Sequence, residues 1–560
     1  MSLLGLRSVL PAGAPHLQEV LARAGAPGFG ADIIAPAPAR PFLAAALAEA
    51  IGEADDADLP VVVAVTASVS EAEDLAAGVD DLLGADSATV FPGWETLPHE
   101  RLSPSADTVG ERIDVLRRLT TGDARSRVIT TSVRALLQPF ARDLAQIDPV
   151  IARTGDEVDL DALAHQLVQF GYSRTDLVER RGQFAMRGGI LDVFPPTAEH
   201  PVRVELFGDV VEEVRAFSVA DQRSLADVPE GLHALPVREL LLTDEVRRRA
   251  DELSRAHPQL AEIASKIAEG QVADGMETLT AALVDDLVLL IDLLPPGSTL
   301  LICDPERVRA RAEDLVATSQ EFLEASWHTA AAGGVAPLDM AALESTGAGA
   351  LDLSGSAYRD LDDVARSAQS RGLGQWATGA FGLSAEALDI PVEIINPYRG
   401  VITDAVADIR GWITDGRAVV VVAEGHGSAE RLAISLREEG LTTNQVDDLQ
   451  APPTPREVTV TTARLTEGAV LPGVVVLTEA DLLGERTQVR DLGRMPSRRR
   501  RTIDPLQLTP GDFIVHEQHG VGRYVEMVQR TVADATREYL VLEYASSKRG
   551  QPADRLYGPT

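Results

Sequence analysis

The chain has 560 residues, of which 45% are hydrophobic and 24% are charged, a composition typical of folded globular proteins rather than disordered ones. Its formal net charge of -35 argues against duplex DNA as the main partner, because proteins bind DNA by neutralising its phosphates with cations. The single cysteine, Cys303, excludes an internal disulfide and a zinc site built from several cysteines. No apolar run approaches the roughly 18 residues that span a bilayer, and the start lacks a secretory layout, so we expect a cytoplasmic protein.

The charge is unevenly distributed along the chain. Residues 490–560 carry 12 Lys+Arg against 9 Asp+Glu, a net charge of +3, which leaves 39 against 77, or -38, for residues 1–489. This difference indicates that the C-terminal segment is a separate domain.

Residues 1–150 alternate between helical and strand-like patterns. The predicted elements are a helix from Pro41 to residue 52, a buried strand at 59–67, a helix at 70–83 with Ser70 as its N-cap, a strand at 88–91, a helix that includes 113–119 and a strand at 127–131. Alternation of this kind predicts a doubly wound parallel sheet.

Residues 151–235 form a predicted antiparallel unit inserted into this α/β domain. After a helix at 158–171, extended runs at 182–195 and 200–217 alternate apolar and polar residues, with a turn at Gly208–Asp209. Residues 236–360 return to helices and one buried strand at 299–303, so we assign them to the second part of the first domain.

The rest of the chain is predicted to form two further domains, which makes the fold class α/β multidomain. Residues 380–487 make a small α/β domain with strands at 392–395, 418–423, 458–460 and 473–477 and helices at 405–415 and 428–439. Residues 488–507 have the composition of a linker, and residues 508–560 have an all-β pattern with glycine-rich turns.

The first strand-to-helix turn has the position of a phosphate-binding loop without its chemistry. Ala35 and Arg40 stand at the two glycine positions of a P-loop, Pro41 at the lysine and Phe42 at the Ser/Thr. The only two lysines, Lys266 and Lys548, each follow a serine rather than a glycine, so the sequence contains no Walker A motif. We therefore predict a degenerate nucleotide site, no catalytic residues, no metal site and no ATP hydrolysis by this chain, although Asp304 ends a strand that resembles a Walker B motif.

Arg187 precedes a Gly-Gly pair in the inserted unit, where positive φ angles allow a sharp turn. An arginine beside such a turn, with Phe194 seven residues on, is a candidate recognition site, because arginine and aromatic side chains are enriched at interface hot spots. The alternative is that Arg187 pairs with a local acid such as Asp192 or Glu205.

Several blocks of sequence are similar to one known family. They are FPGWETLPHE (91–100), VITTSVRALLQ (128–138), FAMRGGILDVFP (184–195), RVELFGDVVEEVRAFSVADQRSL (203–225), PGDFIVHEQHGVGRYVEM (510–527), EYLVLEYA (538–545) and DRLY (554–557). Together and in this order they resemble the bacterial transcription-repair coupling factor. The resemblance implies that the chain is the N-terminal half of such a protein, which continues with an ATP-driven translocase and a regulatory domain.

The resemblance implies that residues 1–360 are similar to the first part of the excinuclease protein UvrB. The inserted unit would then bind UvrA, with the contact residues Arg174, Arg187 and Phe194. A further arginine of UvrB corresponds to Ala185 here, which puts the strength of the contact in question. No cofactor is implied for this part of the protein; ATP and magnesium are implied for the motor domains, as is most DNA contact.

The segment from Leu508 resembles the RNA polymerase interaction domain, a Tudor/SH3-like barrel also found in CarD-type regulators. In that family it adds a strand across its interface with the β subunit of the polymerase. Residues 525–531 are the predicted edge, and the predicted contact residues are Arg523, Val525, Met527, Val528, Gln529 and Arg530. Gly558 stands where relatives have valine, so we expect the last strand, and with it the barrel, to be weakened.

The predicted function is a docking platform that binds UvrA and RNA polymerase and couples removal of stalled polymerase to nucleotide excision repair, with no role at a membrane. Two alternatives remain from the sequence. One is a CarD-like polymerase-binding regulator with an inert acidic scaffold, and the other is a divergent helicase half that still binds nucleotide. The role of residues 380–487, the oligomeric state and any masking of the UvrA-binding patch are left open.

Overall fold

The computed structural model describes residues 2–52, 59–97, 102–121, 126–257, 260–331, 356–484, 513–516, 520–532, 535–544 and 554–559. Among residues 320–331 and the strands beyond residue 512, side chains are described only for Arg523, Tyr524 and Val525. The chain divides into two compact units, Met1–Leu492 and Gly493–Thr560, which we describe separately. No described helix is long and apolar enough to cross a membrane.

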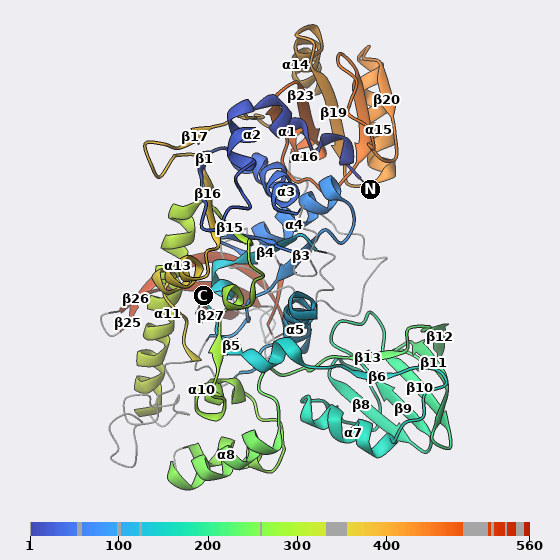
Figure 1. Ribbon diagram of the computed structural model, residues 1–560, viewed down its shortest axis with the longest axis vertical. Helices are drawn as coiled ribbons and strands as arrows, with labels where there is room; N and C mark the ends of the chain where they lie inside the picture. The colour runs from blue at the N-terminus through green and yellow to red at the C-terminus, as the bar shows by residue number, and fades with distance from the viewer. Residues whose placement is uncertain are drawn as a thin grey trace. The chain divides into compact units, whose positions relative to one another are not determined.

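Seven parallel strands form the first sheet, in the order β17-β1-β16-β15-β2-β4-β3 (Figure 1). The strands are β1 (Asp32–Ile34), β2 (Val62–Thr66), β3 (Ala88–Phe91), β4 (Val128–Ser132), β15 (Thr299–Cys303), β16 (Gly374–Gly379) and β17 (Leu388–Asp389). Along β2, Val62 and Ala64 enter one hydrophobic core whereas Val63 and Val65 enter another. A strand that is buried on both faces needs an unbroken apolar run, which is the pattern seen at β2. All neighbouring strands of the sheet pair in parallel, so the predicted parallel sheet is confirmed.

Helices cover both faces of this sheet. They are α3 (Arg40–Ile51) and α4 (Val69–Leu83) in the core on one face, and α5 (Ala106–Thr121), α6 (Val133–Leu136), α11 (Pro305–Ala331) and α13 (Leu361–Ser370) in the core on the other. The N-cap of α4 is Ser68, whose hydroxyl accepts the Glu71 N–H, and not the predicted Ser70. The cap lies two residues earlier than expected because Ser68 is the residue that keeps an extended backbone before the helix.

The sheet continues beyond residue 360, where the sequence analysis ended the domain. β16 lies between β1 and β15, and β17 pairs with β1, so residues 374–389 belong to this sheet. No strand was predicted at β16, whose sequence GQWATG contains a single large apolar side chain, Trp376. Small residues give little hydrophobic alternation, although β16 is buried between neighbouring strands.

The inserted unit has a six-stranded sheet in the order β12-β11-β10-β9-β8-β7. The strands are β7 (Ser173–Arg174), β8 (Gln183–Arg187), β9 (Ile190–Val193), β10 (Val202–Phe207), β11 (Val210–Phe217) and β12 (Ser224–Asp227). All neighbours are antiparallel except β7 and β8, and α7 (Leu160–Gln169) contributes to the core on one face. The chain enters through β6 (Val150–Ala152) and leaves through β13 (Leu232–Ala234), which pair with each other. The predicted antiparallel unit is therefore present.

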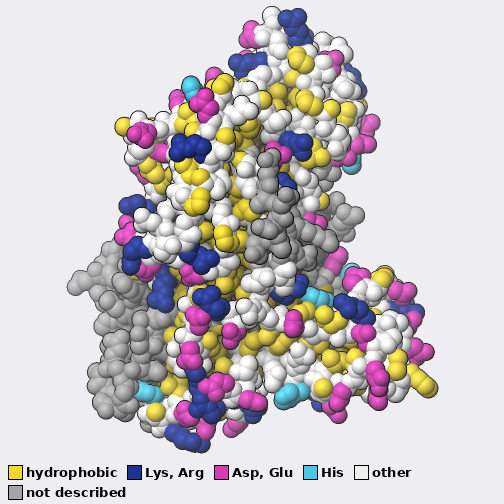
Figure 2. All heavy atoms as spheres, in the orientation of Figure 1, with side chains coloured by type: hydrophobic (Ala, Val, Ile, Leu, Met, Phe, Trp, Pro, Cys, Tyr) yellow, Lys and Arg dark blue, Asp and Glu magenta, His cyan; other side chains and the backbone are white. Residues whose placement is uncertain are grey.

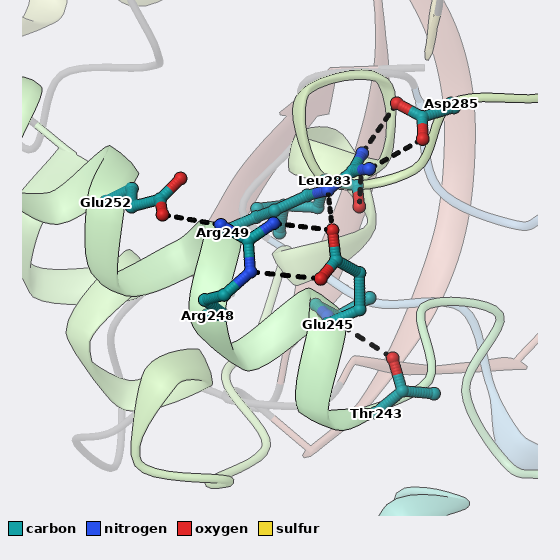
Figure 3. Close-up of polar contacts among 8 residues, drawn as sticks. Thr243, Glu245, Arg248, Arg249, Glu252, Leu283 and Asp285 are labelled. Carbon is teal, nitrogen blue, oxygen red and sulfur yellow. Dashed lines mark hydrogen bonds and ion pairs between the residues drawn. The ribbon is translucent and has the colours of Figure 1, made fainter.

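A helical segment follows the inserted unit and has its own core. It contains α8 (Asp244–Ala256), α9 (Ala261–Ala268), the 3₁₀ turn η5 (Met276–Leu279) and α10 (Thr280–Leu283). Figure 3 shows Arg249 donating to both carboxylate oxygens of Asp285 at 2.6 Å, while Glu245 accepts from Arg248 and Arg249. The hydrogen bonds that Arg248 and Arg249 donate to Glu245 lower the pKa of this carboxyl group to about 2. Figure 2 shows basic and acidic side chains interspersed over this part of the visible face, so its arginines do not form a field of one sign.

A second α/β sheet has the order β18-β22-β23-β19-β21-β20. It is built from β18 (Glu393–Ile394), β19 (Ala418–Ala423), β20 (Thr443–Gln445), β21 (Val458–Thr462), β22 (Ala469–Leu471) and β23 (Val474–Thr478), with α14 (Ile402–Thr414), α15 (His426–Glu438) and α16 (Glu479–Leu483). These helices pack on one face. The other face shares a core with α3, α4 and the N-terminal helices η1 (Leu4–Leu6), α1 (Val9–Gly13) and α2 (Pro15–Leu21).

The second unit contains four antiparallel strands in the order β24-β25-β26-β27. They are β24 (Phe513–His516), β25 (Gly520–Val532), β26 (Ala535–Tyr544) and β27 (Asp554–Pro559). The last strand pairs with β26 along its length, including Gly558 opposite Leu540, so a strand forms where the glycine was expected to weaken it. The all-β pattern is confirmed for the described residues, whereas closure into a barrel stays a prediction. The linker at residues 488–507 lies outside the described residues.

Candidate functional site

The loop after β1 holds the residues predicted to form a degenerate nucleotide site. Ala35 is buried and donates its N–H to the carbonyl of Gly379 at 2.8 Å. Residues 37–39 form a 3₁₀ turn that leads directly into α3, where Arg40 is the first residue. The guanidinium of Arg40, only 13% exposed, lies 3.8 Å from the carboxylate of Asp304 at the end of β15. The structure thus brings the loop and the Walker B-like acid together as an ion pair.

These residues do not fit a nucleotide with magnesium. Pro41 stands in the first turn of α3, where it has neither a backbone N–H nor an ammonium group for phosphate. Phe42 is 1% exposed and packs in the core, so no hydroxyl is available for a metal ion. Asp304 faces the cations of Arg40 and Arg307 at 3.8 and 3.9 Å, which compete with any metal for its carboxylate. In the described residues, β1, α3 and β15 are thus joined here by core packing and by the ion pair between Arg40 and Asp304.

The two arginines predicted to contact UvrA are both exposed on the inserted sheet. Arg187 is the last residue of β8, and Arg174 lies on the edge strand β7, in register with Phe184. The guanidinium group of Arg187 donates to the backbone carbonyl of Asp176, which holds the side chain near the β7 side of the sheet. Arg174 is therefore set back from the end of the sheet at which Arg187 lies.

Phe194, the third predicted contact residue, is not on a surface patch. Its side chain is 1% exposed and belongs to a small core with Val178, Ala185 and Phe217. The guanidinium of Arg181 lies 5.3 Å from the ring centroid and completes its cover. The prediction of an exposed Phe194 is therefore wrong. Val193 packs in the core on the α7 side of the sheet, and Phe194, the next residue, packs in a second small core. The sequence alone could not show that this second core exists.

The local acid considered as a partner for Arg187 is used by a different arginine. Asp192 accepts two hydrogen bonds from Arg203, at 2.7 and 2.9 Å, across the pair β9–β10. This bidentate contact raises the pKa of Arg203, whose guanidinium also stacks 4.7 Å from the ring of Phe217. Ala185, the position at which the resemblance implies an arginine in UvrB, is buried opposite Asp192 and belongs to the small core.

A buried polar joint, which the sequence analysis missed, links the inserted unit to the first sheet. Glu239, just after the inserted unit, accepts from Arg112 of α5 at 2.6 Å and from the indole N–H of Trp94 at 2.9 Å. The two charged side chains are 0% and 3% exposed. Arg112 also lies over the ring of Phe91 at 4.4 Å and donates to the carbonyl of Pro92 at 2.8 Å. The FPGWE segment, interpreted above only as part of a family pattern, thus packs against this ion pair and hydrogen-bonds to it.

Further contacts attach the same unit to α5 and to the helical segment. Arg181 donates to Asp107 at 2.8 Å near the start of α5. Arg238 lies 3.8 Å from Glu277, which accepts from the hydroxyl of Ser103 at 2.5 Å. Burial raises the pKa of Glu277 above its ordinary value, with Arg238 acting in the opposite direction. Ion pairs therefore join the inserted unit to α5 through Arg181 and, at its exit, to the helical segment through Arg238.

The predicted polymerase-binding strand is β25. Arg523 is exposed, Tyr524 is 5% exposed and Val525 is half-buried. Met527, Val528, Gln529 and Arg530 lie on the same strand, but their side chains are outside the described part of the structure. β26 pairs along β25 from Arg523 to Val532, whereas the pairing with β24 covers only Gly520 to Arg523. Among the described strands, one side of the second half of β25 is thus available for a further strand.

Comparisons with known proteins agree with the resemblance found in the sequence. The family described as "UvrB interaction domain" matches residues 150–238, and the family described as "CarD-like/TRCF RID domain" matches residues 508–560. The chain is 44% identical, over 98% of its length, to a protein of Mycobacterium bovis (strain ATCC BAA-935 / AF2122/97) named "Transcription-repair-coupling factor". Proteins of the same name from Myxococcus xanthus and Bacillus subtilis (strain 168) are 30% and 23% identical over 89% and 90% of the chain. The resemblance is therefore confirmed.

The chain spans about half the length of these curated relatives. It covers 45% of the Mycobacterium bovis protein and 42% of each of the other two. The two matched families lie in separate parts of the chain, one in the inserted unit and one in the second compact unit.

We expect Glu239→Gln to lower the free energy of unfolding of the first unit by about 3–5 kcal/mol, because it leaves the Arg112 guanidinium buried without a counter-charge. Urea denaturation followed by tryptophan fluorescence measures the change. The matched control is Asp286→Asn, which removes a 2.6 Å ion pair with Arg142 whose partners are 61% and 42% exposed and which we expect to contribute at most about 1 kcal/mol. Equal effects of the two substitutions would contradict the role of the buried joint.

Proposed function

We propose that this chain is the docking part of a transcription-repair coupling factor and that it acts in the cytoplasm. Residues 150–238 bind UvrA, and residues 508–560 bind the β subunit of RNA polymerase. The ATP-driven translocase, with most of the DNA contact, lies in the part of the family's chain that this sequence does not span. The observation that carries the proposal is the presence of both docking families in one chain.

The proposed UvrA contact uses charge on a rigid sheet. Arg174 and Arg187 are exposed on β7 and β8, and a guanidinium can bind a carboxylate through two parallel hydrogen bonds. Phe194 supports the sheet from its small core instead of touching the partner. The buried joint at Glu239 holds the sheet against α5, so that binding need not first order a flexible domain.

The proposed polymerase contact uses the backbone of β25. A strand of the polymerase β subunit would pair with the side of β25 that β24 leaves uncovered after Arg523. Main-chain hydrogen bonds would supply affinity, and the side chains from Arg523 to Arg530 would supply specificity. The first unit is acidic, with a net charge of -38 over residues 1–489, whereas residues 490–560 carry a net charge of +3.

Charge reversal at Arg187 tests the UvrA contact. Arg187→Glu should weaken UvrA binding by about 1.5–3 kcal/mol, the usual contribution of hydrogen bonds to charged groups. Arg223→Glu is the matched control, because this substitution changes the net charge by the same amount. The Arg223 side chain is 85% exposed and lies at the opposite end of the same sheet, just before β12. Isothermal titration with purified UvrA measures both. An unchanged affinity for the Arg187 variant would move the contact elsewhere.

Removal of residues 493–560 tests the division of labour. Because these residues form a separate compact unit, their deletion should abolish capture of the polymerase β subunit and leave UvrA binding within about twofold. Pull-downs of the two partners by the full chain and by the truncated chain measure this. A CarD-like regulator with an inert scaffold would show no UvrA capture in either form, which would overturn the proposal.

The proposal also excludes ATP turnover by this chain. Equilibrium dialysis with labelled ATP and magnesium should show no saturable binding, because Pro41 and Phe42 replace the phosphate- and metal-binding residues and Arg40 pairs with Asp304. Saturable, magnesium-dependent binding that is lost in Arg40→Glu would instead support the helicase-like alternative.

A further inference from the structure

An aromatic side chain stands almost fully in solvent at one end of the inserted sheet. Phe207 is 80% exposed, and Val210, opposite it in the β10–β11 register, is 46% exposed. Between them lies the turn Gly208–Asp209, in which Gly208 has the positive φ of 64° that a two-residue hairpin turn requires. We call Phe207 and Val210 the hairpin tip.

The hairpin tip and Arg187 lie on the same face of the sheet. Met186 and Leu206 both pack against the core to which α7 contributes. Because successive side chains on a strand point to opposite faces, Arg187 and Phe207 project from the other face. Neither the arginine nor the phenylalanine is thus available to that core.

The two side chains also lie at the same end of the sheet. Arg187 ends β8 and Phe207 ends β10, and β9 runs antiparallel between them (Figure 1). The N–H of Leu206 donates to the carbonyl of Gly189 at 2.8 Å, so the turn that follows Arg187 lies beside the last residues of β10. Two strand spacings of about 4.8 Å separate β8 from β10, a distance within one protein contact patch.

Hydrogen bonds from a neighbouring loop hold the backbone on either side of Val210 in the hairpin tip. Val158 donates to the carbonyl of Asp209 at 2.8 Å, and Gly155 donates to the carbonyl of Val211 at 2.8 Å. Val211 in turn donates to the carbonyl of Asp156 at 2.9 Å. A partner that covers the tip would therefore lose little conformational freedom in ordering it, which favours binding.

Resting on the proposed function, we propose that the hairpin tip is the apolar anchor of the UvrA contact. Phe207 enters an apolar pocket of UvrA while Arg187 meets an acidic group beside that pocket. Aromatic residues and arginines dominate interface hot spots, and the exposed pair Phe207 and Arg187 supplies both on one face and at one end of the sheet. Phe207 thus takes the role that the sequence analysis assigned to Phe194, whose ring is buried.

The test measures UvrA affinity by isothermal titration for the full chain and for Phe207→Ala, Phe207→Leu and Arg187→Glu. We expect Phe207→Ala to weaken binding about 10- to 100-fold and Phe207→Leu to retain more affinity, since an apolar side chain still fills the pocket. Phe381→Ala is the matched control, because Phe381 is equally exposed, at 80%, and lies in the loop between β16 and β17 of a different sheet. It should leave the affinity unchanged. Removal of an exposed side chain creates no core cavity, so circular dichroism should be the same for all variants.

The outcomes separate the anchor from the proposed function. If the full chain binds UvrA and Arg187→Glu weakens binding while Phe207→Ala stays within twofold, the anchor is overturned and the proposed function stands. If the full chain does not bind UvrA, both are overturned. Sedimentation equilibrium provides the remaining test: a self-association that Phe207→Ala abolishes, with unchanged UvrA affinity, would assign the hairpin tip to a second copy of this chain and overturn the anchor.

Discussion

The buried ion pair between Arg112 and Glu239 is the interaction on which the placement of the inserted unit depends. Both side chains are almost fully removed from solvent, and the pair joins α5 of the first sheet to the residue that follows the inserted unit. Such a pair adds little net stability over apolar packing, but it tolerates few alternative geometries, because a displaced partner leaves a charge buried alone. Trp94 and Phe91 extend the same constraint to the FPGWE segment. The joint therefore fixes orientation, which is what a docking platform needs from its scaffold.

A second constraint joins the two α/β sheets into one compact unit. Leu3, Leu6 and Leu10 of the N-terminal segment are fully buried in a core that also contains Val420 and Val476 of the second sheet. Backbone hydrogen bonds add to this core, since Gly5 donates to Leu449 and Leu449 donates to Ser2, both at 2.8 Å. A side chain at Gly5 would collide with the carbonyl of Ala451, so the approach is as close as a glycine permits. The second sheet is thus part of the scaffold, a role that the sequence had left open.

Elements with a strong apolar pattern were predictable, and those without one were not. The runs at β2, β19 and β23 are buried on both faces and were recognised as strands, because a parallel strand between two helical layers needs only apolar residues. β16 was missed because burial there depends on small residues between two neighbouring strands. The sequence shows Pro41 and Phe42 where a phosphate-binding loop has Lys and Ser/Thr, but the pairing of Arg40 with Asp304 brings together residues 264 positions apart and needed the structure. The same holds for Arg112 with Glu239.

Phe194 and Phe207 show why surface residues resist sequence reasoning. Each ends or follows a strand of the same sheet, and each alternates onto the face that α7 does not cover. One is 1% exposed and the other 80%, because Val178, Ala185 and Phe217 cover the first, whereas the β10–β11 turn carries the second beyond the sheet. A strand pattern reports which face a side chain is on, but not whether other parts of the chain fold over that face. On this face the loops decide which side chains are exposed, and in this chain they leave both Arg187 and Phe207 exposed.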